Sequence, residues 1–313
     1  MSQPSLNRRK LLIGFGGAAL AACTGPLAGG RTTRSLSVTI DDFDIGGDPM
    51  LTASERHDAV LQALDVYHIK ACGFPAGKYI DRPEGQRQLS QWAERGHSIG
   101  CHSYDHALYG GKDPARFAAD LDRALPLVAH HSTSVPLFRF PYLAEGSTAE
   151  GRDAARTALS KRGLANGHVT IDTSDWYIAG RLSARLRKSP DADLAPYRDF
   201  YIAHLLDRAD YYDKLAFDVL GHTIPHTILL HHNLAAALFL GDALAAFRRN
   251  GWRLIDASEA FAHPVFRRQP AIAPAGQSLP WQLAKESGRF EQRLRFPGED
   301  GDYEKPAMDR LQL

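Results

Sequence analysis

The 313-residue chain is poor in cysteine, with three, and its apolar run at residues 11–22 is shorter than the roughly 20 residues that span a bilayer. Cys72 and Cys101 do not have the spacing of a cysteine zinc clip, which argues against a cysteine-ligated metal. Export to an oxidising compartment would allow a disulfide between them, and two buried free thiols fit the sequence equally well. The chain also has no internal repeat and no low-complexity tract.

Residues 1–22 lack acidic side chains and have the pattern of an export signal. Residues 7–12, Asn-Arg-Arg-Lys-Leu-Leu, look like a twin-arginine signal at the start of the apolar run. Residues 20–23, Leu-Ala-Ala-Cys, resemble a bacterial lipobox, in which Cys23 becomes the lipidated first residue. Cleavage near the alanines with loss of Cys23 is the alternative. We predict an export signal over residues 1–22, lipidation of Cys23, and a tether over residues 23–34.

The charge balance gives no sign of a nucleic-acid partner. Three of the 37 basic residues lie in residues 1–22, so 34 basic and 36 acidic residues remain, a net formal charge of −2. No block of basic residues remains either, and such a block is the usual footprint of nucleic-acid binding. We therefore expect no nucleic acid, and membrane association through a lipid anchor alone.

Short apolar segments alternate with segments of helical periodicity along most of the chain. A capping box at residues 52–55 starts one helix, and Asp113-Pro114 starts another that Pro126 is expected to end. Seven strands in alternation with helices predict an α/β fold with a parallel sheet, either open or closed into a barrel. The predicted strands are 37–40, 69–74, 98–101, 137–140, 169–171, 228–230 and 252–255, and the other predicted helices are 85–95, 148–162, 191–220, 234–250 and 258–262.

Polar side chains follow five of the predicted strands. In α/β barrels the carboxyl ends of the strands build the active site, so these side chains are expected to face one shared opening. They are Asp41 and Asp42, His102 and His106, Arg139, Asp172 and Asp175, and His231 and His232.

The two histidines at 102 and 106 are the first candidate for a metal site. Imidazoles four residues apart can converge on one ion if the chain turns once between them, and zinc is the usual ion at such a site. For the pair alone, ordinary surface or loop histidines are the better explanation. Asp42, at the abrupt end of an apolar run, supplies a third ligand. Three protein ligands leave coordination positions open, as in catalytic zinc sites.

Five motifs in order resemble the polysaccharide deacetylase family, the NodB-homology group of carbohydrate esterases (family 4). They are Thr-Ile-Asp-Asp at residues 39–42, His-Ser-Tyr-Asp-His at 102–106, Arg-Phe-Pro-Tyr at 139–142, Asp-Thr-Ser-Asp-Trp at 172–176, and Leu-Leu-His at 229–231. Each motif is weak alone, and the series on five strand ends is specific. Phe43-Asp44 stands where the family has Gly-Pro, so the loop over residues 43–52 gives no substrate preference.

The resemblance implies a deformed (β/α)7-type, NodB-like barrel with one Asp-His-His metal site. Asp42, His102 and His106 would hold Zn2+ or another divalent transition metal. Asp41 would be the general base for the attacking water, because chain alternation turns it away from Asp42. Capping of the loop after the first strand is the simpler reading of either aspartate.

The remaining roles also come from the resemblance. His231 would protonate the leaving group, with Asp175 tuning it and Arg139 holding Asp41. The backbone N–H of Tyr142 would complete an oxyanion hole, and Trp176 would form an apolar wall at the acetyl methyl group. Surface ion pairing would explain Arg139 as well, and packing would explain Trp176 and Tyr142. His232 also fits the last motif if the register slips by one, so both histidines remain candidates for the general acid.

The resemblance implies a metal-dependent hydrolase that removes acetyl groups from an N- or O-acetylated glycan of the bacterial cell envelope, on the periplasmic side. A metal-dependent amidohydrolase acting on a non-carbohydrate C–N bond is one alternative. A lipoprotein that binds glycan without catalysis is another. The predicted catalytic domain spans residues 35–265. A C-terminal extension, residues 266–313, is rich in proline, glycine and charge, and is expected to wrap the outside or be partly mobile.

Overall fold

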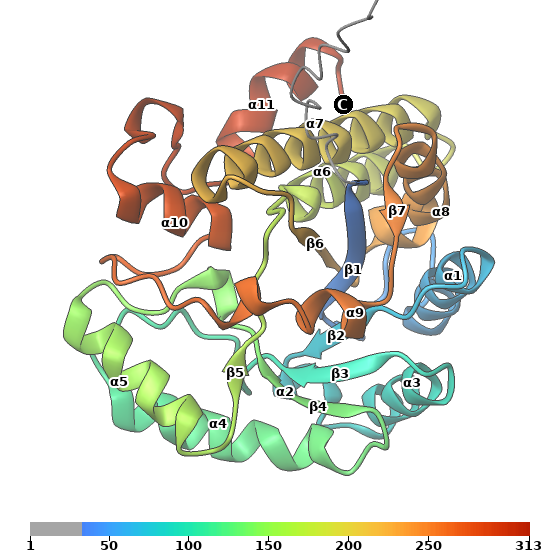
Figure 1. Ribbon diagram of the computed structural model, residues 1–313. Coiled ribbons are helices and arrows are strands. Elements are labelled where there is room, and N and C mark those ends of the chain that lie inside the picture. The colour runs from blue at the N-terminus through green and yellow to red at the C-terminus, as the bar shows by residue number, and fades with distance from the viewer. Residues whose placement is uncertain (1–32) are drawn as a thin grey trace, which may run out of the picture. The chain divides into compact units, whose positions relative to one another are not determined.

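The computed structural model describes residues 33–313, which belong to one compact unit (Figure 1). The predicted export signal, Cys23 and nearly all of the predicted tether lie outside the described residues. Among the residues that are described, no helix has both the length and the apolar content needed to cross a membrane.

A parallel sheet forms the centre of the described unit. Its strands run in the order β5-β4-β3-β2-β1-β6, and β7 pairs with the beginning of β1. β1 therefore lies between β2 and β6, buried on both faces, as expected of a central strand in a parallel sheet. The strands are β1 (Ser35–Asp42), β2 (Cys72–Pro75), β3 (Ser98–Cys101), β4 (Ser134–Phe138), β5 (Ala165–Asn166), β6 (Pro225–His231) and β7 (Arg253–Leu254).

One short segment links the two edges of this sheet. β5 pairs with β4, and a few residues later Ile171 forms an isolated parallel bridge with Ile228 of β6. The Ile171 N–H donates to the Thr227 carbonyl at 3.0 Å, and the Leu229 N–H donates to the Ile171 carbonyl at 2.9 Å. The sheet thus curls into an incomplete barrel, which confirms the predicted deformed α/β barrel.

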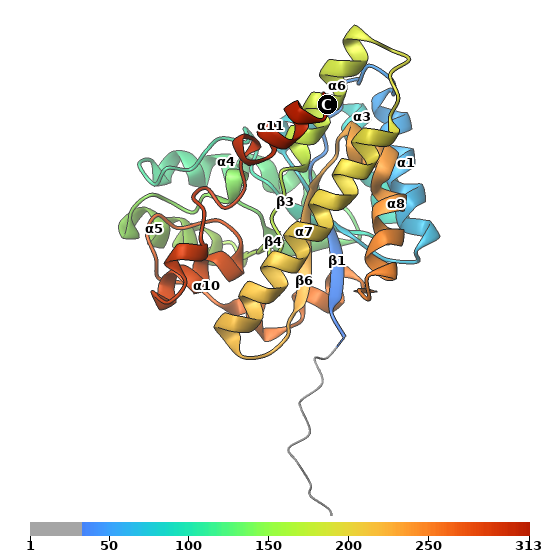
Figure 2. The same cartoon turned by 90° about the horizontal axis from the view of Figure 1, so that it is seen from above.

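The helices cover the outside of the curled sheet. α7 packs against α8 and α10, α1 against α8, and α4 against α5, and Figure 2 shows α7 and α8 beside β1 and β6. The helices are α1 (Ala53–Val66), α2 (Gly77–Ile80), α3 (Pro83–Glu94), α4 (Pro114–Ala129), α5 (Ala149–Ser160), α6 (Asp175–Lys188), α7 (Ala195–Leu220), α8 (Leu234–Arg249), α9 (Ala257–Phe261), α10 (Leu279–Ser287) and α11 (Gly301–Arg310).

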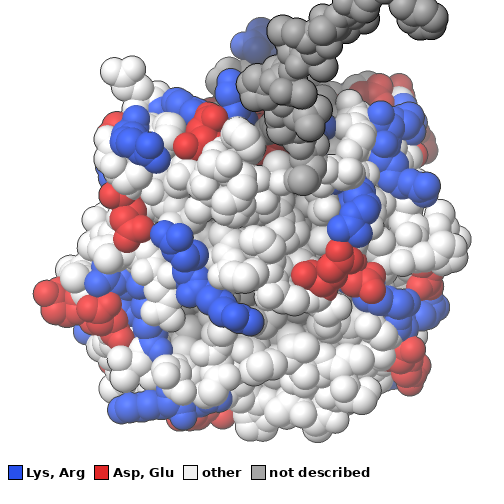
Figure 3. Space-filling model, viewed as in Figure 1, with Lys and Arg blue, Asp and Glu red and all other residues white. Residues whose placement is uncertain are grey.

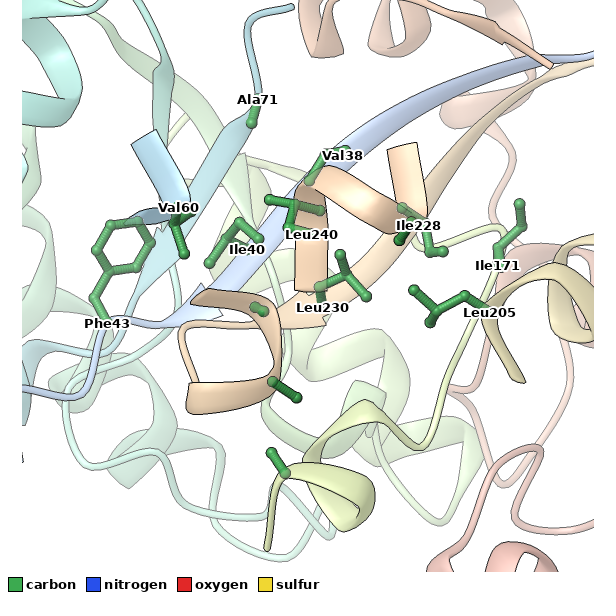
Figure 4. Packing of buried hydrophobic residues seen from close by; sticks show 14 of the residues in the cluster. Val38, Ile40, Phe43, Val60, Ala71, Ile171, Leu205, Ile228, Leu230 and Leu240 are labelled. Carbon is green, nitrogen blue, oxygen red and sulfur yellow. The ribbon is translucent and has the colours of Figure 1, made fainter. Parts of the chain in front are cut away.

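Alternation along the central strands separates an apolar outer layer from a polar interior. Val38 and Ile40 of β1 lie with Ile228 and Leu230 of β6 against Leu240 of α8, and all five are buried (Figure 4). Burying a side chain of this size stabilises the fold by about 1.5–3 kcal/mol. The intervening residues of β1 point to the opposite face, into the barrel, where the polar groups of the site gather.

Several predicted boundaries are wrong. The second strand begins at Cys72 rather than residue 69, and the fourth ends at Phe138 rather than residue 140. The predicted strand at residues 169–171 makes a single bridge, and the regular pairing lies just before it, at β5. Strand ends depend on the partner strand, which a local pattern does not contain.

Pro126 does not end its helix. α4 continues to Ala129, because Ala124 and Val128 on either side of the proline are buried against the core. Proline inside a helix costs about 3 kcal/mol, and this packing offsets the cost.

The predictions miss α6. α6 carries Arg181, Arg185 and Arg187, and these charged residues make its buried stripe of apolar residues hard to recognise in the sequence.

The C-terminal extension is not a mobile tail, because it contains α10 and α11 and buries Trp281 and Met308 in the main core.

Cys72 and Cys101, left undecided by the sequence, are buried free thiols. Burial raises the pKa of each to about 12, so both are protonated and unreactive at neutral pH. On the surface, acidic and basic side chains are interspersed along the sides of the face in Figure 3, and neither sign forms a continuous patch there.

Candidate active site

The two aspartates at the end of β1 point in different directions. Asp41 follows the alternation of the strand into the barrel interior and is almost fully buried. Asp42 has a left-handed backbone, with φ of 77°, which turns its carboxylate toward the two histidines after β3. A non-glycine residue in this region is strained, and such strain is often found at functional sites.

His102 and His106 meet Asp42 at one point. Asp42 Oδ1 lies 3.1 Å from Nε2 of His106 and 3.5 Å from Nε2 of His102. The chain turns between the histidines because Ser103 and His106 both have positive φ, and the Ser103 hydroxyl accepts the His106 N–H at 3.1 Å. The structure therefore brings the three predicted metal ligands together.

The tautomer of His102 directs a lone pair toward this point. Its Nδ1 lies 2.8 Å from the Arg139 carbonyl oxygen, which can only accept, so Nδ1 carries the proton and Nε2 is free to bind. Burial lowers the pKa of His102 to about 4, which keeps the ring neutral.

The three groups fit a tetrahedral divalent metal. Among the described residues, no hydrogen bond of good geometry reaches the buried Asp42 Oδ1. Burial alone would raise the pKa of Asp42, but the contact with His106 and the nearby charge of His231 hold it well below its usual range. Ligand atoms about 2.0–2.1 Å from a tetrahedral zinc are about 3.3 Å apart, close to the two distances that involve Asp42.

A second cluster, His204, Glu299 and Glu304, has similar spacing but does not fit a metal. Nε2 of His204 accepts the Ser174 N–H at 3.0 Å, so the proton of the neutral ring is on Nδ1. Nδ1 lies 3.3 Å from the Glu304 carboxylate and donates to it. Both ring nitrogens of His204 are therefore occupied.

Arg139 lies behind the cavity and holds Asp41. Its guanidinium is fully buried and donates to both Asp41 oxygens, at 3.0 and 3.3 Å. It also donates to Thr39 Oγ1 at 3.3 Å and to the Gly167 carbonyl at 2.6 Å. Asp41 is thus fixed in position, with one oxygen 3.8 Å from His102 Nε2.

His231 ends β6 and is paired with Asp175 at the start of α6. Its Nδ1–H donates to Asp175 Oδ1 at 2.7 Å, and its backbone N–H donates to Asp175 Oδ2 at 2.9 Å. The Asn233 amide also donates to Oδ2, at 2.8 Å. Burial alone would lower the pKa of His231, but the charge and hydrogen bond of Asp175 raise it to about 10.

His232 has a different environment, which separates the two candidates for the general acid. It is buried outside the barrel interior, where its ring stacks on Phe43 with the centroids 5.0 Å apart. Its Nε2 lies 3.1 Å from Nδ1 of His57. Burial holds the pKa of His232 well below its usual value. His231, which keeps a proton and lines the cavity, is therefore the histidine with the properties of an acid.

A cavity of about 850 Å³ opens over these groups. Tyr142 and Trp176 line it with 63% and 48% of their surface exposed. Tyr142 has a left-handed backbone, with φ of 55°, so its peptide geometry is a further strained feature of the site. The predicted residues that line the cavity are Asp41, Asp42, His102, His106, Tyr142, Trp176 and His231, with Arg139 and Asp175 buried behind it.

Part of the lining was not predicted. Residues 108–110 and a wall formed by residues 274–277 and 296–300 contribute to the cavity. Asp172 was noted at a strand end without a role, and it lines the cavity as well. The C-terminal wall has no periodic pattern in the sequence, and an exposed aromatic residue such as Phe296 is not a signal by itself.

The described residues bring the Asp41–Arg139 and His231–Asp175 pairs together beside three side chains whose donor atoms suit a divalent metal, on a curled α/β sheet. Residues 28–163 match the family model described as polysaccharide deacetylase. A comparison with curated proteins gives no match.

Three solved structures share the fold at low sequence identity. A mutant of a CE4-family pseudoenzyme is 17% identical, with 74% of this chain and 68% of that chain covered and a TM-score of 0.53; the wild-type protein is from Bacillus anthracis. A polysaccharide deacetylase from Bacillus cereus is 18% identical, with 71% and 91% covered and a TM-score of 0.50. A CE4 esterase from Streptococcus mutans is 17% identical, with 72% and 87% covered and a TM-score of 0.51.

Residues 28–163 thus resemble the polysaccharide deacetylase family, and the chain shares the fold of these solved structures.

Proposed function

We propose that this protein is a metal-dependent deacetylase that removes acetyl groups from an N- or O-acetylated glycan of the cell envelope. The observation that supports this most is the meeting of three metal-competent atoms, from Asp42, His102 and His106, in the cavity that Asp41 and His231 also line. A bound divalent ion, with zinc as our first choice, would act as a Lewis acid toward the acetyl carbonyl and the attacking water.

Asp41 accepts the proton of the attacking water. Its position between Arg139 and the cavity suits this role, because the guanidinium fixes both carboxylate oxygens. As the water oxygen bonds to the acetyl carbon, the carbonyl oxygen gains negative charge. The backbone N–H of Tyr142 is our candidate for a hydrogen bond to that oxygen.

His231 donates a proton to the leaving nitrogen or oxygen as its bond to the acetyl carbon breaks. The products are acetate and an amine or alcohol on the glycan. Asp175 keeps His231 protonated and oriented through two hydrogen bonds. Trp176 forms an apolar wall on which the acetyl methyl group can pack.

Residue identity supports catalysis over binding alone. One structure of similar fold is described as a pseudoenzyme, so the fold by itself does not establish activity. In this chain each position of the proposed mechanism carries a group able to perform its step. The proposed setting is the periplasmic side of the cell envelope, with the mature chain anchored by a lipid at Cys23.

Acetate release from peptidoglycan, chitooligosaccharides, acetylxylan and a panel of small acetylated amides tests the proposal. We expect release from a glycan, loss of release after chelation, and recovery on adding zinc. Release of acetate from the small amides alone would show that the substrate is a non-carbohydrate amide rather than a glycan. Glycan binding by metal-loaded protein without release of acetate would make it a binding protein.

A further inference from the structure

The C-terminal extension forms one wall of the cavity. Residues 274–277 and 296–300 line the same space as the metal-competent group, although they lie outside the part of the chain that matches the family model. Figure 1 shows the segment after α9 running past the loop before α5 and then turning into α10. The extension therefore contributes part of the surface of this cavity.

Hydrogen bonds fix this wall to the barrel at its first segment. The Ala275 N–H donates to the Gly146 carbonyl at 2.8 Å, and the Glu145 N–H donates to the Ala275 carbonyl at 3.0 Å. Gly276, with φ of 129°, has no room for a side chain because a Cβ there would collide with the Leu143 carbonyl oxygen. The contact is thus a close backbone pairing that holds residues 274–277 in place.

The second segment is fixed through Glu299. Its carboxylate accepts from the Tyr212 hydroxyl at 3.0 Å, from Arg208 at 3.3 Å, and from Arg295 at 2.9 and 3.0 Å. The Gly298 N–H also donates to the Gln277 side chain, which joins the two segments. Three of these bonds end on Oε1 and one on Oε2, so the Glu299 carboxylate is held by three side chains and positions the wall.

Phe296 presents an open aromatic face at this wall. It lines the cavity with 63% of its surface exposed, while Trp281 supports it from within, with ring centroids 5.9 Å apart. A large exposed apolar side chain beside a catalytic centre is a candidate contact for a ligand.

Asp172 supplies a polar group to the same cavity. It is 8% exposed, and in the part of the chain that the structure describes, its one hydrogen bond comes from the Thr173 N–H to Oδ1, at 2.9 Å. Burial and the negative charge of Glu299 raise the pKa of Asp172 to about 8, so at neutral pH it is mostly protonated and can donate as well as accept.

We propose that Phe296 and Asp172 form a subsite for a second sugar ring of the substrate, beyond the unit that carries the acetyl group. This inference rests on the proposed function. A sugar ring has an apolar C–H face that can stack on Phe296 and hydroxyl groups at its edge that can bond Asp172. A purely apolar group would give Asp172 no hydrogen bond beyond the one from the Thr173 N–H, which is unfavourable for a buried carboxyl group. A cationic group would gain little from a protonated acid.

The test compares one long and one minimal substrate. An N-acetylated chitooligosaccharide can fill both sites, whereas 4-nitrophenyl acetate reaches the acetyl site alone. For Phe296→Ala we expect the ratio of kcat/KM for the oligosaccharide to that for the ester to fall about tenfold, the loss that removal of one stacked ring brings. Leu311→Ala, an exposed apolar residue of the same extension away from the cavity, is the matched control and keeps the wild-type ratio.

Asp172 is tested by two substitutions. Asp172→Ala should lower the same ratio, and Asp172→Asn should retain most of it because the amide both donates and accepts. If Asp172→Ala fails to fold, the exposed Phe296→Ala variant still decides the matter. An unchanged ratio in Phe296→Ala would overturn the subsite and leave the deacetylase proposal intact.

Calorimetric titration with the oligosaccharide separates the two proposals. If the wild-type protein releases no acetate from any substrate, the proposed function fails. Weaker binding to Phe296→Ala than to Leu311→Ala would then still support the subsite. Equal binding to both variants would overturn it.

Discussion

Glu304, in the C-terminal helix α11, lies 3.3 Å from Nδ1 of His204 in α7, and the opposite nitrogen of that ring accepts the Ser174 N–H. Ser174 immediately precedes Asp175, the partner of His231. The contact of Glu304 with His204 is therefore joined to the proposed general acid through the Ser174 backbone and the Asp175 side chain. Glu304 and His204 are positioning residues for the turn at Ser174.

Glu304→Ala should lower kcat about tenfold, because His204 loses the acceptor that fixes its tautomer and with it the Ser174 turn. Glu304→Gln should retain most of the activity, since its amide oxygen accepts the same hydrogen bond. The measurement is kcat and KM for both variants. A role limited to folding would instead lower the melting temperature and leave kcat per folded molecule unchanged.

Asp175→Asn should move the alkaline limit of activity to lower pH. The acid form of His231 persists up to its pKa of about 10, so wild-type kcat should fall only as the pH rises through that value. Removing the Asp175 charge leaves the effect of burial, which lowers the pKa of His231, so the proton is lost at lower pH. A kcat profile from neutral to alkaline pH checks this, and an unmoved alkaline limb would show that His231 is not the acid.

Asp41→Asn should lower kcat by about 10²–10⁴, the usual contribution of a general base. The amide keeps an oxygen that can accept from Arg139, so the fold and metal binding should survive. Metal content, melting temperature and kcat are measured together, with Asp58→Asn on the exposed face of α1 as the control. Normal hydrolysis by a metal-loaded Asp41→Asn protein would rule out the assigned mechanism.

Metal binding at the Asp42 group should stabilise the fold. At an ion concentration about 100 times the dissociation constant, the free energy of unfolding rises by about 2.7 kcal/mol. Zinc should therefore raise the melting temperature of chelator-treated wild-type protein, and the effect should largely disappear in His106→Ala. An equal rise in the melting temperature of both proteins would show that the ion binds at another site.

The barrel and its strand-end residues could be predicted because their signals are local. Apolar runs end in Asp42 and His102, and the carboxyl ends of parallel strands share one edge of the sheet. The left-handed backbone that turns Asp42 toward His106 has no such signal, since aspartate tolerates this conformation but adopts other conformations far more often.

The wall of the cavity could not be predicted for a different reason. Asp172 and Phe296 share the cavity although more than a hundred residues separate them in sequence, and the extension that carries Phe296 has no strand or long amphipathic helix. Its position depends on bonds such as those of Glu299 to Arg208 and Arg295, which exist only after folding. Composition left open a tail that wraps the outside or is partly mobile, because it does not record such pairings.

Cys23→Ser tests the proposed anchor separately from catalysis. Cys23 precedes the described residues, and the described part of the chain contains every residue assigned to the site, so the variant should hydrolyse substrate at the wild-type rate. We expect it to move from the membrane fraction to the soluble fraction of the exported material, because a lipid on this cysteine is the proposed attachment. Fractionation of cells that express either form, followed by acetate-release assays on both fractions, measures location and activity together. Retention of Cys23→Ser in the membrane fraction would show that lipidation is not the means of attachment, without affecting the assignment of the active site.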